Sequence, residues 1–183
     1  MNLQKIISSK KYLFIDRDGV INKRIFGGYI TCIADFELLD DFLTSIKSFT
    51  CHFKRIFVVT NQQGVGKGLM SLDDLSKIHE FLLREVEKYG GKIDAVYFCP
   101  DLKDAQNNCR KPGLMMAEQA KADFPEVDFS ESIMIGDTKS DLEFAKNANM
   151  MSVLLLTEHS TQQEIALADM CINSLIELTN LLK

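Results

Sequence analysis

The sequence lacks the features that mark membrane, exported and nucleic-acid-binding proteins. No apolar run in its 183 residues approaches the roughly 20 residues of a membrane-spanning helix, and the N-terminus shows no signal-peptide pattern. Lys and Arg total 21 against 26 Asp and Glu, a formal net charge of −5, so there is no basic excess to attract nucleic acid. We therefore expect a cytoplasmic protein with no membrane and no nucleic-acid partner.

The sequence also lacks a disulfide pattern, internal repeats, low-complexity stretches and long linkers. Its five cysteines are odd in number and scattered (Cys32, Cys51, Cys99, Cys109 and Cys171). Without an export signal, this distribution favours reduced thiols over a disulfide framework. The length and the hydrophobic fraction of 46% are ordinary for one globular domain, so we expect a single domain over residues 1–183, acting as a monomer.

Short apolar runs alternate with helical patterns along the chain. The runs that predict buried strands are residues 12–15, 55–60, 95–98, 132–135 and 152–156. The patterns that predict helices are residues 36–49, 72–89, 114–122, 141–148 and 174–182; the clearest, 72–89, begins with a capping box of Ser71 and Asp74. Strands that are apolar throughout predict an α/β fold, a Rossmann-like parallel sheet between two layers of helices.

Two acidic residues follow the first predicted strand. Asp16 and Asp18 are separated by one residue and followed by Gly19. If the extended conformation continues, both carboxylates point to the same side and repel each other, which a divalent cation such as Mg²⁺ would offset. The same residues also make a good turn, because Asp and Gly tolerate turn geometry. The choice depends on the rest of the chain.

The second predicted strand ends in Thr60 and Asn61 and runs into a glycine-rich loop, residues 62–68. A hydroxyl, an amide and free backbone N–H groups there suit an anion. The loop matches neither a Walker A motif, because Asn61 stands where its first glycine belongs, nor a dinucleotide fingerprint, because Leu69 stands at its third glycine. On its own it could equally be a plain connection.

Two further motifs lie at predicted loops. Arg110 and Lys111 precede a helix and could clamp phosphate oxygens, although a solvated basic turn has the same composition. Asp137 lies at the end of the fourth strand and is a good metal ligand, whereas Asp141 could simply cap the next helix. Because ligands of such sheets bind beyond the carboxyl ends of the strands, the four motifs together indicate a phosphoryl-transfer site.

With these motifs the sequence resembles the haloacid-dehalogenase-type phosphatases. The match runs in order over nearly the whole chain: Asp16-Arg17-Asp18-Gly19, Thr60-Asn61, Lys111, and Gly136-Asp137 with Asp141. Within that superfamily it is most similar to the group of small histidinol-phosphate and heptose bisphosphate phosphatases. The heptose branch is the closer fit, on Gly28-Tyr29, the loop 62–68 and Cys99-Pro100.

The resemblance implies a role for each matching residue. Asp16 would be the nucleophile that forms an aspartyl-phosphate, and Asp18 the general acid and base. Mg²⁺ would be held by Asp16, Asp137 and the backbone carbonyl of Asp18, with Asp141 in support. The substrate, a small phosphorylated sugar, would be bound by Thr60, Asn61, Gln62, Arg110 and Lys111. The implied reaction removes the 7-phosphate of D-glycero-D-manno-heptose 1,7-bisphosphate.

One departure from the family concerns a zinc loop. The family usually has Cys-x-His followed by Cys-x-Cys, where this chain has Cys99, Asp101, Asn107 and Cys109. Because asparagine is a poor zinc ligand, we expect no structural Zn²⁺, and a loop 99–109 that is held by packing or hydrogen bonds. Residues 22–36 are too few for a cap domain, so only loop 99–109 and residues 26–33 could partly cover the site.

Three other functions remain as alternatives. A histidinol-phosphate phosphatase would share the chemistry, but the sequence shows no acidic patch to receive the amine. A nucleic-acid 3′-phosphatase is disfavoured by the net charge. A non-catalytic phosphate-binding relative is disfavoured because all matching catalytic positions are intact. The histidines His52, His79 and His159 lie far from the motifs in the sequence and are interpreted as surface or packing residues.

Overall fold

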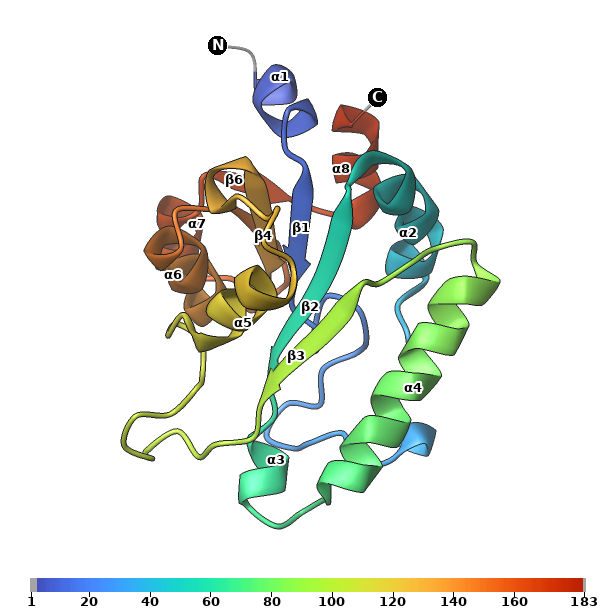
Figure 1. Cartoon of the computed structure of the whole chain (residues 1–183), viewed down its shortest axis with the longest axis vertical. Helices are drawn as coiled ribbons and strands as arrows, with labels where there is room; N and C mark the ends of the chain where they lie inside the picture. The colour runs from blue at the N-terminus through green and yellow to red at the C-terminus, as the bar shows by residue number, and fades with distance from the viewer. Residues whose placement is uncertain (1–2, 183) are drawn as a thin grey trace.

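The protein is organised around one parallel sheet. In the computed structural model, which describes residues 3–182, six strands pair in the order β3-β2-β1-β4-β5-β6 (Figure 1). They are β1 (Tyr12–Ile15), β2 (Arg55–Asn61), β3 (Ala95–Cys99), β4 (Ser132–Gly136), β5 (Met151–Leu155) and β6 (Met170–Ile172). The chain moves outward from β1 in one direction to β3, then returns to the other side of β1 with β4. This reversal puts a topological switch point between β1 and β4, where such sheets bind ligands.

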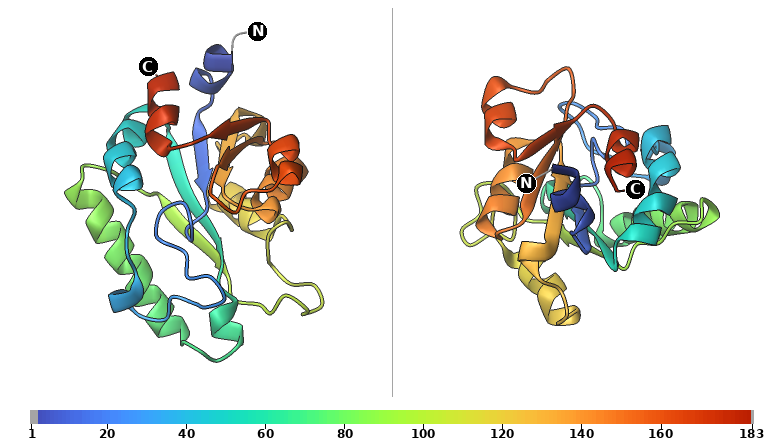
Figure 2. Two further views of the ribbon diagram at one scale, coloured as in Figure 1. Left: turned by 180° about the vertical axis from the view of Figure 1, so that it is seen from behind. Right: turned by 90° about the horizontal axis from the view of Figure 1, so that it is seen from above.

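Helices cover both faces of the sheet (Figures 1 and 2). One layer contains α1 (Leu3–Ser8), α2 (Asp40–His52), α4 (Leu72–Lys88) and α8 (Leu175–Leu181). The opposite layer contains α5 (Met115–Asp123) and α6 (Lys139–Asn147), with α7 (Gln162–Leu167) against α6. The short α3 (Gln63–Gly66) follows β2 directly. Among the described residues, no helix is both long enough and apolar enough to cross a membrane.

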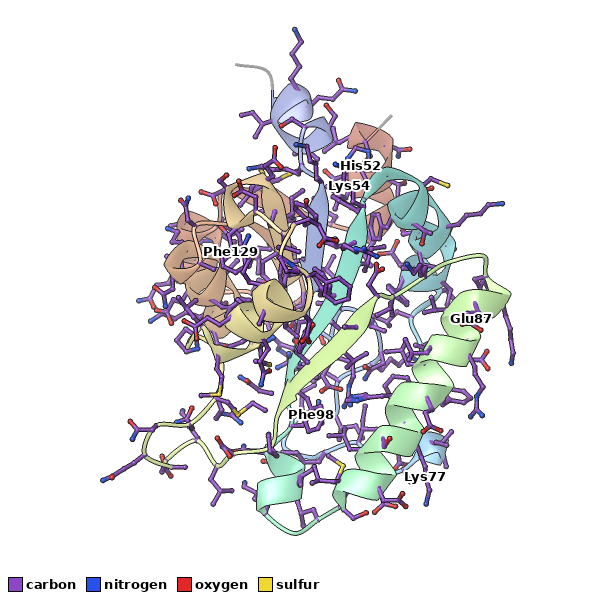
Figure 3. The ribbon with its side chains drawn as sticks, in the orientation of Figure 1. His52, Lys54, Lys77, Glu87, Phe98 and Phe129 are labelled. Carbon is purple, nitrogen blue, oxygen red and sulfur yellow. A yellow bond between two sulfur atoms is a disulfide. The ribbon has the colours of Figure 1, made fainter. Side chains whose placement is uncertain are left out.

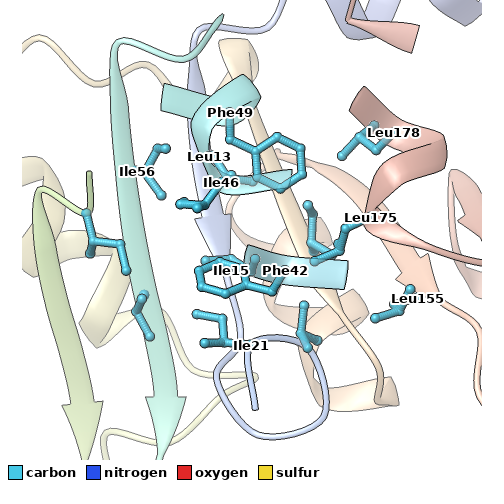
Figure 4. Packing of buried hydrophobic residues seen from close by; sticks show 14 of the residues in the cluster. Leu13, Ile15, Ile21, Phe42, Ile46, Phe49, Ile56, Leu155, Leu175 and Leu178 are labelled. Atoms are coloured by element: carbon cyan, nitrogen blue, oxygen red, sulfur yellow. The ribbon is translucent and has the colours of Figure 1, made fainter. Parts of the chain in front are cut away.

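Alternate residues of the central strand supply the two halves of the core. Leu13 and Ile15 point to the layer that contains α2, where Figure 4 shows Phe42 beside Ile15 and Ile46 beside Leu13. Tyr12 and Phe14 point to the layer that contains α5 and α6. All four strand residues are buried because both faces of the sheet are covered. This burial holds the end of β1, and with it Asp16, in a fixed position.

The predicted fold class is confirmed, and the differences concern short elements and one helix, because the helix predicted over residues 36–49 is α2, Asp40–His52. All five predicted strands are present within about a residue, and the capping box of α4 is formed by Ser71 and Asp74. The sequence reading missed β6, α1, α3 and α7, which have three to six residues each and too little periodicity to detect. Between β1 and α2 the chain forms only one 3₁₀ turn, Ile33–Asp35. The expected absence of a large cap domain therefore agrees with the architecture of residues 3–182.

Candidate active site

The predicted site residues meet at the carboxyl ends of β1, β2 and β4. All of them except Asp137 line a cavity of about 460 Å³, the size of many small-molecule sites. Its wall includes Asp16, Asp18, Thr60, Asn61, Gln62, Arg110, Lys111 and Asp141, together with residues 24–30. Residues 26–30 therefore border the site as expected. Loop 99–109 contributes no wall residue, which corrects the expectation that it would help to cover the site.

A tight turn after β1 places the first two carboxylates. Gly19 has φ of +98°, a conformation that strains other residues, and its N–H donates to the carbonyl of Asn22 at 2.8 Å. A Cβ at Gly19 would lie 2.2 Å from Oδ2 of Asp137, so only glycine allows that carboxylate to approach. The segment thus forms the predicted turn, and this turn brings Asp16, Asp18 and Asp137 together.

Lys111 is buried between two carboxylates. Its Nζ lies 2.8 Å from Asp16 Oδ1 and 2.5 Å from Asp141 Oδ1, and it donates to the carbonyl of Val59 at 2.7 Å. Burial lowers the pKa of Lys111, but the charges of Asp141 and Asp16 outweigh it and raise the pKa above its ordinary value. Lys111 therefore stays charged beside Asp16.

Asp141 both caps α6 and pairs with Lys111. Its Oδ2 accepts from the backbone N–H of Thr138 at 3.1 Å and from the Thr138 hydroxyl at 2.5 Å, which forms the capping box of α6. Its other oxygen pairs with Lys111. Gly136 makes this arrangement possible, because a Cβ there would lie 2.1 Å from the Cβ of Asp141.

Asp18 is held by donors on three sides. Its carboxylate accepts from Arg17 Nη2 at 2.9 and 3.0 Å, from Asn22 Nδ2 at 3.0 Å and from Gln62 Nε2 at 2.7 Å. Burial raises the pKa of Asp18, but the charge of Arg17 and the hydrogen bonds from Asn22, Arg17 and Gln62 outweigh it, so the pKa lies below its ordinary value. The charged carboxylate is thus the favoured form.

Arg24 is a site residue that the sequence reading missed. Its Nη2 donates to the backbone carbonyl of Asp18 at 2.6 Å and to Asp137 Oδ1 at 2.7 Å, and lies 3.6 Å from Asp16 Oδ2. Burial raises the pKa of Asp137, nearby Asp16 raises it further, and Arg24 opposes the rise. Next to Lys23 in a polar stretch, Arg24 looks like a solvated surface charge. The only available signal was its position six residues after Asp18.

The carboxylates fit the magnesium that the resemblance implies. Oxygens of Asp16, Asp137 and Asp141 lie within 4.8 Å of one another. The carbonyl oxygen of Asp18 is close to them, because Arg24 Nη2 donates both to it and to Asp137. Hard oxygen donors of this kind are the ligands that Mg²⁺ prefers. The guanidinium that lies among them shows that these oxygens attract a cation.

Thr60 and Asn61 at the end of β2, and Gln62 directly after it, connect the parts of the site. Asn61 pairs with the backbone of Lys111, accepting its N–H at 2.9 Å and donating to its carbonyl at 3.3 Å. Thr60 is fully buried, and its hydroxyl accepts from Gln62 Nε2 at 2.8 Å. The amide nitrogen of Gln62, predicted to bind substrate, is thus bonded to Thr60 and Asp18, although the residue lines the cavity.

The glycine-rich segment is not an open anion loop, so of the two alternatives left by the sequence the structure favours a plain connection. Residues 63–66 form α3, and the N–H groups of Val65, Lys67 and Gly68 donate within this turn. The N–H of Gly66 donates to the carbonyl of Pro100 at 3.1 Å. A Cβ at Gly66 would lie 2.6 Å from that oxygen, so this glycine serves a close backbone contact.

A disulfide closes loop 99–109, contrary to the expectation of reduced cysteines and a loop held only by packing or hydrogen bonds. Cys99 and Cys109 are joined, with Cα atoms 5.4 Å apart. Cys109 also donates its backbone N–H to Asp101 at 3.0 Å. The sequence could not show this pairing, because the two residues meet only when β3 and the following loop fold back. The bridge anchors Arg110, whose Nη1 donates to the carbonyl of Asp101 at 3.2 Å.

His79 lies far from the motifs in the sequence but close to the site in the structure. It lies on α4, is 7% exposed and contacts Phe98, which is labelled in Figure 3 at the end of β3. Arg17 Nη1 donates to His79 Nε2 at 3.1 Å. Because a guanidinium can only donate, this nitrogen must be an unprotonated acceptor. His79 therefore stays neutral and supports Arg17, which in turn holds Asp18.

We expect His79 to make the protein less stable in acid. Burial and then the charge of Arg17 lower its folded-state pKa to about 3, against about 6.5 in the unfolded chain. The unfolded state therefore binds the extra proton first, and stability falls as pH drops below about 6.5. Between pH 7.5 and pH 5 this amounts to about 2 kcal/mol. We expect the loss of unfolding free energy between these two pH values, measured with urea, to be smaller by this amount in His79→Gln than in wild type.

The exposed His159 supplies the control for this experiment. His159→Gln should keep the wild-type dependence of unfolding free energy on pH, since its side chain is 55% exposed. An unchanged dependence in His79→Gln would contradict a buried neutral imidazole.

Comparison with known proteins agrees with this arrangement. The sequence model of the HAD-hydrolase-like family matches residues 108–178. A D-glycero-alpha-D-manno-heptose-1,7-bisphosphate 7-phosphatase of Campylobacter jejuni is 37% identical over 152 residues, 83% of this chain and 86% of the relative. A beta-heptose counterpart from Haemophilus ducreyi is 32% identical and covers 92% of this chain and 96% of its own length.

A solved structure has the same fold. The D,D-heptose 1,7-bisphosphate phosphatase of B. bronchiseptica, crystallised with magnesium and phosphate, superposes with a TM-score of 0.83 at 26% identity. The alignment covers 93% of this chain and 96% of that one. The sheet order and the cluster of carboxylates define a hydrolase of the haloacid-dehalogenase type. The chain belongs to that family's phosphatases, in the group of the D-glycero-D-manno-heptose-1,7-bisphosphate 7-phosphatases.

Proposed function

We propose that the protein is a Mg²⁺-dependent phosphatase that removes the 7-phosphate of D-glycero-D-manno-heptose 1,7-bisphosphate. The observation that carries the proposal is the position of Asp16 on the wall of a 460 Å³ cavity, with Lys111 Nζ 2.8 Å from its carboxylate. A nucleophile and a fixed cation at one point suit the attack on a phosphorus atom and the negative charge that develops there. The names of the relatives supply the substrate.

In the first step, Asp16 attacks the phosphorus of the 7-phosphate. A bond forms between an Asp16 oxygen and phosphorus, the bond from phosphorus to the sugar oxygen breaks, and Asp18 gives that oxygen a proton. Lys111 holds charge on the transferring group. Asp18 must be protonated for this step although its surroundings favour the charged form. The negative charge of an arriving phosphate raises the pKa of a neighbouring carboxyl and so favours that proton.

In the second step, water releases the phosphate. Asp18, now a carboxylate, takes a proton from water, whose oxygen attacks phosphorus and breaks its bond to Asp16. The donors around Asp18 stabilise the carboxylate that this step requires. Mg²⁺, held by Asp16, Asp137 and the carbonyl of Asp18, would supply positive charge that offsets the charge of the phosphoryl group. Thr60, Asn61 and Arg110 would help to hold the substrate.

The charge of the cavity favours a bisphosphate over histidinol phosphate. Lys67 and Arg110 both line it in addition to Lys111, and Lys67 Nζ lies 5.1 Å from the centre of the Tyr29 ring. Two cations beyond the reacting group attract a second phosphate and repel the ammonium group of histidinol phosphate. This distribution supports a substrate with an anion at each end. We also propose that residues 1–183 form a single domain and that the protein is a cytoplasmic monomer.

The test is phosphate release from a panel of substrates, with Mg²⁺ and with EDTA. The panel contains both anomers of the heptose bisphosphate, histidinol phosphate and a 3′-phosphorylated oligonucleotide. We expect Mg²⁺-dependent release of one phosphate per heptose bisphosphate. The kcat/KM for histidinol phosphate should be lower by about 10- to 100-fold, the effect of one or two lost charged hydrogen bonds. Because relatives are named for both anomers, the panel also decides the anomer.

Two results would change the proposal. A preference for histidinol phosphate would keep the mechanism and replace the substrate. Equal turnover with Mg²⁺ and with EDTA would remove the metal from the mechanism.

A further inference from the structure

The guanidinium of Arg24 lies on the three oxygens that are proposed to hold Mg²⁺. Nη2 is 2.6 Å from the carbonyl oxygen of Asp18, 2.7 Å from Asp137 Oδ1 and 3.6 Å from Asp16 Oδ2. Nε adds a second contact to the same carbonyl at 3.2 Å. One nitrogen of this side chain is therefore within reach of every proposed metal ligand.

A guanidinium and a magnesium ion cannot share this position. Mg²⁺ binds oxygen at about 2.0–2.1 Å in a nearly octahedral arrangement, so an ion on these three oxygens overlaps the space of Nη2. The two cations would also repel each other strongly at such a distance. Binding of the metal therefore requires the head group of Arg24 to leave the carboxylates.

The segment around Arg24 allows such a movement. The Arg24 side chain is 29% exposed and lines the cavity, so its head group can turn toward solvent. Ile25 and Phe26 are 41% and 67% exposed, and a Cβ at Gly27 would have no atom within 4 Å. Although the Phe26 ring contacts the ring of His159, these exposed residues are less constrained than the buried strand that precedes Asp16.

We propose that Arg24 is a built-in competitor of the divalent cation. Its guanidinium neutralises the carboxylates of Asp16 and Asp137 when no metal is bound, and Mg²⁺ must displace it to bind. Arg24 thereby lowers the affinity for the metal and stabilises the metal-depleted protein. This inference rests on the proposed function, because it assumes that these oxygens are the magnesium ligands.

The experiment measures binding of Mg²⁺ alone by calorimetry, after divalent cations have been removed with EDTA and dialysis. Arg24→Gln should bind Mg²⁺ about 10- to 100-fold more tightly than wild type, since the metal no longer breaks charged hydrogen bonds. Lys23→Gln is the matched control, because it removes the neighbouring positive charge, which pairs with the exposed Glu37. Its affinity for Mg²⁺ should be unchanged.

A second variant separates displacement from general charge. Arg24→Lys keeps the charge but has a single donor group and a shorter side chain, so it cannot hold the same oxygens together. Displacement predicts a Mg²⁺ affinity between those of wild type and Arg24→Gln, whereas a pure charge effect predicts the wild-type value. In EDTA, Arg24→Gln should unfold at a lower temperature than wild type, and Mg²⁺ should raise its unfolding temperature more.

Asp137→Asn distinguishes failure of this inference from failure of the proposed function. If Asp137→Asn weakens Mg²⁺ binding but Arg24→Gln binds no more tightly than wild type, the metal site stands and competition by Arg24 is wrong. If Asp137→Asn binds Mg²⁺ as wild type does, these oxygens are not the metal ligands and both proposals fail. Tighter binding by Arg24→Gln, together with weaker binding by Asp137→Asn, supports both.

Discussion

Replacing Asp16 by asparagine is expected to reduce phosphate release by about 10⁴-fold or more. The substitution keeps the size of the side chain and removes the nucleophilic oxygen charge, so only binding and positioning remain. A loss of this size corresponds to about 5.5 kcal/mol in the barrier. Steady-state release of phosphate from the heptose bisphosphate, at saturating Mg²⁺, measures it.

The fold should survive this substitution. Lys111 keeps its contact with Asp141 at 2.5 Å, and the strand before Asp16 is fully buried. Asp104→Asn, at an exposed position of the neighbouring loop, is the control and should keep wild-type turnover. Turnover by Asp16→Asn within a few-fold of wild type would place the nucleophile elsewhere. If the protein merely bound phosphate, Asp16→Asn would instead bind phosphate as well as wild type, or better.

Replacing Lys111 by methionine is expected to cause the largest loss of stability and a large loss of activity. Lys111 is 4% exposed, and its removal leaves the carboxylates of Asp16 and Asp141 buried without their shared cation. Breaking a buried pair in this way costs about 3–5 kcal/mol. For a chain of this size that lowers the unfolding temperature by about 6–20 °C. Turnover should fall by about 10²–10³-fold, because a fixed charge on the phosphoryl group is lost.

Two further variants show whether the buried charge is the cause. Adding Asp141→Asn to Lys111→Met removes one of the stranded carboxylates and should recover part of the stability. Lys139→Met removes an exposed lysine that lies 3.4 Å from Glu143, and its effect should be below about 1 kcal/mol. If Lys111→Met were as stable as wild type, the buried ion pairs would contribute nothing to the fold.

Local sequence patterns predicted the parts of the site that follow strands. Asp16 and Asp137 each come directly after an apolar strand, and parallel strands bring their carboxyl ends to one edge. Thr60 and Asn61 follow the same rule at β2. Lys111 lies on a loop and was placed by resemblance. Its position between Asp16 and Asp141 could not be deduced from spacing.

Residues whose role depends on partners distant in the sequence were missed or misread. Arg24 looked like a surface charge, but the turn at Gly19 brings it to Asp137, 113 residues away. His79 looked isolated, yet α4 packs over Arg17, 62 residues away. Cys99 and Cys109 looked unpaired, and only the return of the loop joins them. In each case the residue type is visible in the sequence, whereas its partner is not.

The sequence by itself determined five of the six strands, the order of motifs and the class of chemistry, because these depend on local hydrophobic periodicity and on residue type. The tertiary structure alone decided which charges meet: Arg24 with the proposed metal ligands and Lys111 with two carboxylates. It also decided that the amide of Gln62 donates to Asp18. The physical reason is that the strength of a charge or hydrogen bond depends on distance and burial. Both are set by how the sheet, its turns and its helices pack together.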